Sequence, residues 1–429
     1  MGSKIGVLVF PAGEINSVEL HAALSTCVNI RLYGASSVDR HGRFIFADYI
    51  SDMPHITSEN FITEINKIIT EHKIDVVVPA HDDVALFFAN NASRINAVIL
   101  NSDKETAEIC RDKKLCYEMF NSQGFCPAVY DDINIFPCFI KPRKGQGAVG
   151  ARIINNPSDI PADISVDEYV ICEYLPGDEL TVDCFTDNEG KLLITLPRSR
   201  QRVFGGVSVR GQNEVLTDEI SCIADTINSR LKFIGLWYFQ IKKAVNNKYK
   251  LLEISSRCAG TMCLSRALGI NLPLLSVYAT LGFRTEIIKN AYNVMVDRTL
   301  ISRYKTDILY DHVYIDYDDT IVINNKVNLQ VMRFIYQCVN NKKNISLITR
   351  HNAHHDDTVT ESLQKHRISL DLFSEIIEPG EKEPKHMYIK KNNSIFIDNS
   401  YAERKAVHEK LNIPVFDVDC VEVLLDWRV

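Results

Sequence analysis

The stretch WYFQIKKAVNNKYKLLEISSR, residues 237–257, contains two runs of apolar and aromatic residues separated by Asn246-Asn247. Runs of this kind on either side of turn residues predict two antiparallel strands joined as a hairpin. Antiparallel pairing would set Gln240 on the first strand close to Glu253 on the second. Mg2+ takes oxygen ligands of these types. The stretch therefore predicts a metal site on paired strands.

A glycine-rich segment lies further upstream, in FIKPRKGQGAVGARII, residues 139–154. Lys141 ends its apolar run, and Gly145, Gly147 and Gly150 follow shortly after. Such a loop can bring backbone N–H groups close to phosphates, and the lysine adds a positive charge. The pattern is not that of a Walker loop, and a glycine-rich hairpin alone is also typical of a mobile turn.

Two acids flank a Pro-Gly turn between these segments, in VICEYLPGDELTVD. Glu173 precedes the turn and Glu179 follows it, and each could equally be a solvated acid at a strand end. The order of the parts says more than any one of them. A lysine with a glycine loop comes first, then E-x-x-x-G-x-E, then glutamine on one strand and E-x-S-x-R on the next.

This order resembles the ATP-grasp superfamily, most closely its carbamoyl-phosphate-synthetase-like and carboxylate–amine ligase members. The resemblance implies a Rossmann-like pre-ATP-grasp domain over residues 1–105, an ATP-grasp domain over residues 106–307, and ATP with Mg2+ or Mn2+ as cofactors. It implies that Lys113 and Lys141 bind the phosphates, that Glu173, Tyr174 and Leu175 contact adenine, and that Glu179 binds the ribose. It also implies that Gln240 and Glu253 bind Mg2+ and that Arg257 binds the γ-phosphate or acyl phosphate. Ser255 stands where the family usually has asparagine, which predicts weaker binding of a second metal ion.

The reaction implied by the family joins a carboxylate to an amine through an acyl phosphate. The segment LPRSRQRVFGGVSVRGQ, residues 196–212, supplies arginines, which can bind an acid substrate in bidentate fashion. Ligases of this type use arginines in the equivalent segment. We expect Arg198 first, and then Arg200 and Arg210, to bind the carboxylate, with a solvated loop as the alternative.

The parts before this segment alternate between strand and helix patterns. KIGVLVF and IDVVVPAHDDVALFFANNA predict a parallel sheet with helices over residues 1–105. DKETAEICRDKKLCYEMFNSQG, residues 103–124, predicts a single helix ended by Gly124. The chain is thus expected to combine α/β and α+β domains.

The last part of the chain contains HVYIDYDDTIVINNK, residues 312–326, in which three aspartates follow an apolar run. Acids at the end of a buried strand predict a metal site. Two more apolar runs end in Thr349 and Asp398, and GEKEPKHMYIKK supplies lysines between them. In a strand, alternate side chains share a face, so Asp316 and Asp318 can address one phosphate.

These parts resemble the haloacid dehalogenase (HAD) superfamily of phosphatases over about residues 308–429. The resemblance implies Asp316 as nucleophile, Asp318 as general acid/base, Thr349 and Lys385 (preferred over Lys382) for the phosphoryl group, and Asp316, Asp318 and Asp398 for Mg2+. Asn399 replaces a second acid, which predicts a looser metal. The short gaps between motifs predict a doubly wound parallel sheet without a cap domain. His351, His354 and His355 could line the entrance, bind a metal or belong to a solvated loop.

The composition is that of an ordinary globular protein, with 46% apolar and 24% charged residues and a net charge of −7. There is no basic block for nucleic acid, no apolar run of membrane-spanning length and no signal-peptide pattern. The 12 cysteines lack paired spacing, so we expect reduced thiols in a cytoplasmic protein. A homodimer is compatible with the sequence.

We interpret the chain as a ligase for a small carboxylate and a small amine, fused to a phosphatase for a related phosphorylated metabolite. One alternative keeps the ligase and makes the last domain a phosphate-binding module without catalysis. Another makes the ATP site a sensor that regulates the phosphatase. The substrates themselves are not specified by the residues.

Overall fold

The chain divides into two compact units in the computed structural model, which describes residues 4–161, 164–165 and 167–428. The first unit runs to Leu300, and the second spans Ile301–Trp427. Residues 1–3, where the first predicted domain begins, and Val429, where the last one ends, lie outside the described residues. The domain boundaries at 105 and 307 stay predictions. None of the described helices is long and apolar enough to cross a membrane.

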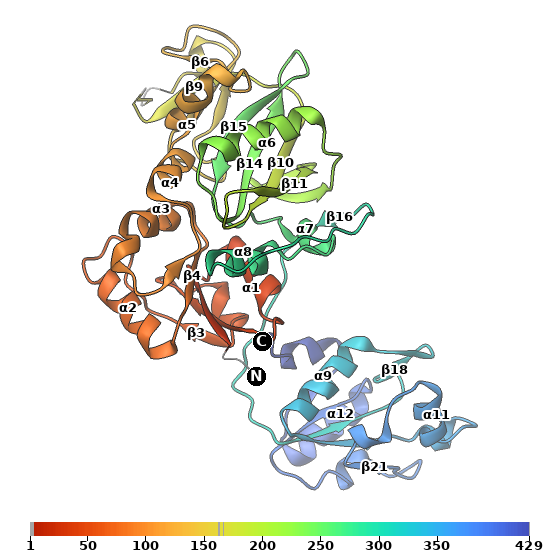
Figure 1. The fold of residues 1–429 in the computed structure, drawn as a ribbon. Coiled ribbons are helices and arrows are strands. Elements are labelled where there is room, and N and C mark those ends of the chain that lie inside the picture. The colour runs from red at the N-terminus through yellow and green to blue at the C-terminus, as the bar shows by residue number, and fades with distance from the viewer. Residues whose placement is uncertain (1–3, 162–163, 166, 429) are drawn as a thin grey trace. The chain divides into compact units, whose positions relative to one another are not determined.

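A five-stranded parallel sheet, as predicted, opens the first unit in the order β3-β2-β1-β4-β5 (Figure 1). Its elements are β1 (Ile5–Phe10), α1 (Ile15–Leu24), β2 (Ile30–Ala35), β3 (Asp48–Ile50), α2 (Phe61–His72), β4 (Val76–Pro79), α3 (Asp82–Asn91) and β5 (Val98–Ile99). Apolar residues of α1 pack on one face, and those of α2 and α3 pack on the other. The strand order changes direction between β1 and β4, where such sheets form a crevice at the carboxyl ends of their strands.

The prediction of a single helix over residues 103–124 is wrong, because the helix is interrupted at one residue. Helix α4 (Lys104–Arg111) ends and helix α5 (Lys113–Phe120) begins at Asp112, whose backbone is extended at φ −111 and ψ 108. Its carboxylate accepts hydrogen bonds from the backbone N–H of Lys114 at 3.0 Å and from Arg143 Nη2 at 2.7 Å. An aspartate that caps the following helix therefore outweighs the helical pattern across it. The helical segment ends at Gly124, at φ +77, as predicted.

Replacing Asp112 with alanine is expected to destabilise the first unit by about 2–3 kcal/mol, because it removes a helix cap and leaves Arg143 without its carboxylate partner. Asp112→Asn keeps the cap and should cost less. The measurement is urea unfolding in a Trp427→Phe background, where the fluorescence of Trp237 reports on the first unit alone. Equal losses in the two variants would contradict the capping role.

A four-stranded antiparallel sheet, β11-β10-β14-β15, forms the centre of the first unit. Its strands are β10 (Glu179–Thr186), β11 (Leu192–Ser199), β14 (Gly235–Lys243) and β15 (Tyr249–Ser255). Helix α5 and helix α6 (Asp218–Arg230) pack on one face. Helix α8 (Leu272–Thr280) belongs to the core on the other face, and the short helix α7 (Cys263–Ala267) precedes it in the chain. The hairpin predicted around Asn246-Asn247 is present as β14–β15, and Gln240 lies opposite Glu253 in its register.

Two smaller sheets flank the central one. One has the order β6-β9-β7-β8, and the other has the order β12-β13-β16. Their strands are β6 (Val129–Tyr130), β7 (Cys138–Pro142), β8 (Arg152–Ile154), β9 (Tyr169–Glu173), β12 (Arg202–Phe204), β13 (Val207–Gln212) and β16 (Met295–Asp297). The β7–β8 and β12–β13 turns touch, because a Cβ on Gly206 would lie 2.1 Å from the Gly147 carbonyl. Both glycines have positive φ, +62 and +76, so neither position suits a side chain.

The second unit is a five-stranded parallel sheet in the order β21-β20-β17-β22-β23, in line with the predicted parallel sheet. Its strands are β17 (His312–Ile315), β18 (Val322–Ile323), β19 (Lys326–Val327), β20 (Asn344–Ile348), β21 (Glu375–Ile377), β22 (Ser394–Ile397) and β23 (Val415–Phe416), and its helices are α9 (Leu329–Asn340), α10 (His351–His354), α11 (Val359–Lys365) and α12 (Tyr401–Leu411). Helices α9 and α11 pack on one face and α12 on the other. Only the small β18–β19 hairpin stands between β17 and α9 among the described residues.

Candidate functional site

A cavity of about 400 Å³ in the first unit is lined by residues of β7, β9, β10, β14 and β15 and by the two glycine turns. All residues assigned to ATP line it, namely Lys113, Lys141, Gly145, Gly147, Glu173, Tyr174, Leu175 and Glu179. A volume of this size is typical of small-ligand sites. The structure thus brings the predicted residues together, while their individual roles stay predictions.

Two lysines lie side by side on the inner wall of this cavity. Lys141 is buried, and its Nζ donates to Tyr117 Oη at 2.6 Å and to the Leu252 carbonyl at 2.9 Å. Burial lowers the pKa of Lys141, and the nearby charge of Lys113 lowers it further. Lys113 Nζ donates to the Gly145 carbonyl at 3.0 Å. The wall therefore concentrates positive charge beside the glycine loop, as an anionic ligand requires.

The acids of this cavity are partly held by neighbours. Glu173 Oε1 accepts from the backbone N–H of Ala128 at 3.0 Å, and Glu179 forms an ion pair with Arg200 at 2.7 Å. The ion pair joins the predicted ribose residue to a predicted substrate residue. No such coupling was predicted from the sequence.

Gln240 and Glu253 lie where this cavity meets a second one of about 220 Å³, since both residues line both cavities. With its amide nitrogen facing Glu253, Gln240 donates to Oε1 at 3.3 Å and accepts from Arg200 Nη1 at 3.0 Å. Glu253 Oε2 also lies 3.4 Å from Lys113 Nζ. Carboxylate and amide oxygens are ligand types that Mg2+ prefers, and the amide oxygen of Gln240 would have to turn from Arg200 to bind it.

A contact between Arg257 and Asp82 spans the second cavity. Arg257 Nη2 lies 2.6 Å from Asp82 Oδ2, and Ser255 Oγ donates to Asp82 Oδ1 at 2.9 Å. Burial opposes the charge of Asp82, but the charge and hydrogen bond of Arg257 and the bond from Ser255 lower its pKa to about 2. Asp82 follows β4 at the carboxyl edge of the first sheet. That position is the only signal in the sequence that could have pointed to it.

Replacing Asp82 with asparagine should destabilise the first unit by about 2 kcal/mol at neutral pH, since its pKa falls from 3.8 to about 2 on folding. A carboxyl group whose pKa is lowered by folding stabilises the fold at pH values above its pKa in the unfolded state. This stabilisation is lost as the pH falls through its pKa in the folded state. The difference between wild type and variant should thus be constant from pH 7 to 5 and shrink from about pH 4 to 2. Urea unfolding across this range measures it, and a difference independent of pH would contradict the ion pair's contribution.

Comparison with known proteins agrees with this geometry. Residues 165–300 match the family model described as ATP-grasp in the biosynthetic pathway with Ter operon. The chain is 33% identical over 102 residues to 3-methyl-D-ornithine–L-lysine ligase of Methanosarcina barkeri, a match that covers 23% of this chain and only 28% of that ligase.

Solved structures resemble the chain at the level of the fold. One is the biotin carboxylase domain of Hydrogenobacter thermophilus 2-oxoglutarate carboxylase, solved with MgADP and bicarbonate. It matches with a TM-score of 0.56 and 14% sequence identity, and the match covers 69% of this chain and 74% of that domain's chain. An L-amino acid ligase from Bacillus licheniformis has a TM-score of 0.53 at 13% identity, covering 65% of this chain and 75% of its own. The first unit has an ATP-grasp fold. The prediction of this fold from the motifs is confirmed.

The three arginines predicted to bind the carboxylate substrate do not gather at one place in the ATP-grasp unit. Arg198 and Arg200 line the 220 Å³ cavity, whereas Arg210 lines neither that cavity nor the 400 Å³ cavity and pairs with Asp297. Arg198 is buried, and its guanidinium donates to both carboxylate oxygens of Asp183, at 2.7 and 3.1 Å. Arg200 is thus the arginine of this set nearest to the predicted metal ligands.

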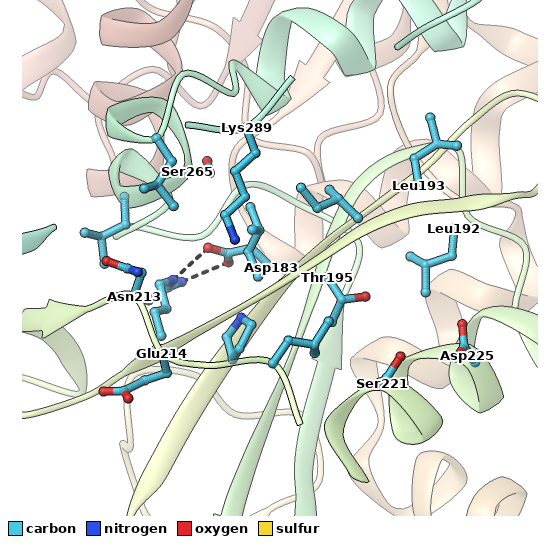
Figure 2. Close-up of a pocket in the computed structure, with 17 residues that line it drawn as sticks. Asp183, Leu192, Leu193, Thr195, Asn213, Glu214, Ser221, Asp225, Ser265 and Lys289 are labelled. Atoms are coloured by element: carbon cyan, nitrogen blue, oxygen red, sulfur yellow. Dashed lines mark hydrogen bonds and ion pairs between the residues drawn. The ribbon is translucent and has the colours of Figure 1, made fainter. Parts of the chain in front are cut away.

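The Arg198–Asp183 pair also borders a third cavity of the ATP-grasp unit, of about 340 Å³. Figure 2 shows Asp183 with its two dashed contacts, Lys289 reaching toward them, and Leu192, Leu193 and Thr195 along the strand. Arg198 lines this cavity and the 220 Å³ cavity alike. Because the guanidinium of Arg198 is paired with Asp183, Arg198 is better placed to stabilise the wall between these two cavities than to bind a substrate.

The second unit gathers its five predicted residues at the carboxyl edge of the parallel sheet. Asp316 follows β17, Thr349 follows β20 and Asp398 follows β22. Lys385 Nζ lies 2.6 Å from Asp316 Oδ1 and 2.6 Å from Asp398 Oδ2. Asp318 Oδ2 accepts from Thr349 Oγ1 at 3.4 Å. Lys382 makes no such contact in the described part of the chain, which supports the choice of Lys385.

Burial dominates the electrostatics of this cluster. Burial and the neighbouring Asp398 carboxylate raise the pKa of Asp316, and burial raises that of Asp398. The single ammonium of Lys385 faces both carboxylates, so one negative charge is left uncompensated when both are ionised. A further cation such as Mg2+, with its preference for carboxylate oxygens, fits this donor set. The roles of these residues, like the resemblance of the unit to a family, stay predictions.

Proposed function

We propose that the ATP-grasp unit is an ATP-dependent carboxylate–amine ligase that works through an acyl phosphate. The observation that supports this most directly is that the residues assigned to ATP and to Mg2+ line one cavity. That cavity shares lining residues with a second one, where Arg200 and Arg257 can hold an acid beside the phosphates.

The reaction follows from this placement. A carboxylate oxygen of the acid substrate attacks the γ-phosphorus of ATP, the bond to the β-phosphate oxygen breaks, and ADP leaves. Lys113, Lys141 and Arg257 neutralise charge that grows on phosphoryl oxygens. The amine then attacks the acyl carbon, phosphate departs and the amine loses a proton. Gln240 and Glu253 would hold Mg2+, which supplies further positive charge at the phosphates.

We further propose that the second unit is a phosphatase of the haloacid dehalogenase type without a cap domain. Asp316 attacks the phosphorus of a phosphorylated metabolite, and Asp318 gives a proton to the leaving oxygen. Water then hydrolyses the aspartyl phosphate, with Asp318 taking a proton back. Lys385 and Thr349 hold phosphoryl oxygens, and Asp316 and Asp398 would hold Mg2+. The bridging of Asp316 and Asp398 by Lys385 supports this proposal.

Amino acids are the first substrates to test, because the matched relatives are named as a 3-methyl-D-ornithine–L-lysine ligase and an L-amino acid ligase. The full chain is given ATP, Mg2+ and pairs of amino acids, and ADP formation is measured. For an active pair, an acid labelled with 18O in its carboxylate should pass label to inorganic phosphate. ADP formation that needs no acid, or phosphate without label, would contradict the acyl-phosphate route.

A further inference from the structure

Three polar side chains converge beside the Asp316 cluster of the second unit. His351 Nδ1 lies 2.8 Å from Asp318 Oδ1, and His355 Nε2 lies 3.5 Å from the same oxygen. The three ligand atoms all lie within 4.8 Å of one another. Donor atoms around a tetrahedral zinc ion, at 2.0–2.2 Å from the metal, are separated by about 3.3–3.6 Å, so the cluster is close to the required size.

The local backbone explains why the two imidazoles lie together. His351 begins the short helix α10, and the backbone N–H of His355 donates to the His351 carbonyl at 3.0 Å. His355 directly follows the helix, with an extended backbone at φ −131 and ψ 156. Their rings stack with centroids 4.3 Å apart and planes 17° apart. Histidines at this spacing on one face are a recurrent metal-binding pair.

Groups behind the cluster hold one of its members, His351, in an orientation that suits a metal. His351 Nε2 lies 3.3 Å from Asp357 Oδ1, and Tyr317 packs edge-on against the same ring. A metal-binding histidine commonly donates its other N–H to a carboxylate in this way. If Nε2 carries the proton, the lone pair of Nδ1 faces Asp318. The contact at 2.8 Å would then be repulsive, and a cation bound by both groups would relieve the repulsion.

A proton on His351 could satisfy two partners, but it would not account for His355. The second imidazole approaches the same carboxylate oxygen although its side chain is 48% exposed and free to turn to solvent. Two imidazoles and one carboxylate around a common point form a nitrogen-rich donor set. Such a set favours zinc-like transition metals over Mg2+.

We propose that Asp318, His351 and His355 bind one divalent transition metal ion of the zinc class, at a site separate from the Asp316–Asp398 pair. Binding itself does not depend on the proposed phosphatase activity. Its consequence does: a metal on Asp318 removes the carboxylate that would transfer the proton, so the bound ion would inhibit phosphate release.

The test is a titration of the metal-free full chain with Co2+ in excess Mg2+, followed by visible absorption. Co2+ bound to imidazole nitrogen should give d–d bands at one equivalent, and Zn2+ should displace them. His355→Ala removes an exposed ligand and should weaken binding by at least about 100-fold, whereas Asp357→Asn should weaken it about 10–100-fold. His354→Ala, at the exposed neighbouring histidine, is the matched control and should bind as the wild type does.

Absorption bands that persist in His355→Ala, or a wild type that gives none at millimolar Co2+, would overturn the proposal. The readout is binding, so it remains decisive even if the chain hydrolyses no phosphate ester. If phosphatase activity is present, Zn2+ should inhibit the wild type and His354→Ala at lower concentrations than His355→Ala. Equal inhibition of all three would overturn the inhibitory consequence alone.

Discussion

Replacing Asp316 with asparagine is expected to reduce phosphate release from p-nitrophenyl phosphate, in the presence of Mg2+, by at least about 1,000-fold. The amide is nearly the same size as the carboxylate but cannot form an aspartyl phosphate. It also removes one of the two carboxylates that contact Lys385. The expected loss therefore combines a missing nucleophile with a weaker metal site.

Asp319→Asn is the matched control for this experiment. Asp319 is exposed and has a φ of +54, a conformation that asparagine adopts readily. Its rate should remain within about twofold of wild type, because exposed substitutions of this kind usually have small effects. Release that survives in Asp316→Asn would contradict the phosphatase. No release from the wild type, with retained binding of phosphorylated metabolites, would favour a binding module.

Replacing Glu253 with glutamine is expected to lower acid- and amine-dependent ADP formation by about 100- to 1,000-fold. Glu253 lies opposite Gln240 on β15, borders both cavities and faces Lys113 at 3.4 Å. The substitution keeps the shape of the side chain but removes the negative charge that would hold Mg2+ and orient Lys113. The loss should fall mainly on kcat, because the charge is needed most as the phosphoryl group transfers.

Glu189→Gln, on the exposed turn between β10 and β11, makes the same chemical change away from both cavities. It should leave ADP formation unchanged within about twofold. Mg2+ dependence gives a second readout, since Glu253→Gln should need a higher Mg2+ concentration for half-maximal rate. A normal rate and a normal Mg2+ requirement in Glu253→Gln would rule out Glu253 as a metal ligand.

The parts of the fold that follow from local pattern were predictable. The turn at Asn246-Asn247 and the apolar runs beside it predicted the hairpin, in which Ile241 pairs with Leu251. A register shift between Ile241 and Gln240, which no local pattern indicated, then brings Gln240 opposite Glu253. The order of motifs likewise pointed to the residues that line the 400 Å³ cavity. The choice of Lys385 rested on spacing alone, and its contacts with Asp316 and Asp398 support that choice.

Features that depend on distant partners were missed. The pairing of Asp82 with Arg257 joins residues 175 positions apart, and nothing local marks it. The pairing of Arg210 with Asp297 takes that arginine away from the cavities through the β13–β16 strand contact. The helix break at Asp112 was hidden because the residues on both sides favour helix, and only the cap and the Arg143 contact decide it.

The meeting of Gly147 with Gly206 has a consequence for how quickly a spent nucleotide can leave. The two turns touch through backbone atoms, and a few such atom pairs contribute only about 0.1–0.2 kcal/mol each. The turns are held instead by polar bonds, from Arg200 to the Gly206 carbonyl at 3.1 Å and from Lys113 to the Gly145 carbonyl at 3.0 Å. Separating the two turns would break polar contacts and little apolar contact. The rate of ADP release should therefore depend more on salt concentration than on temperature.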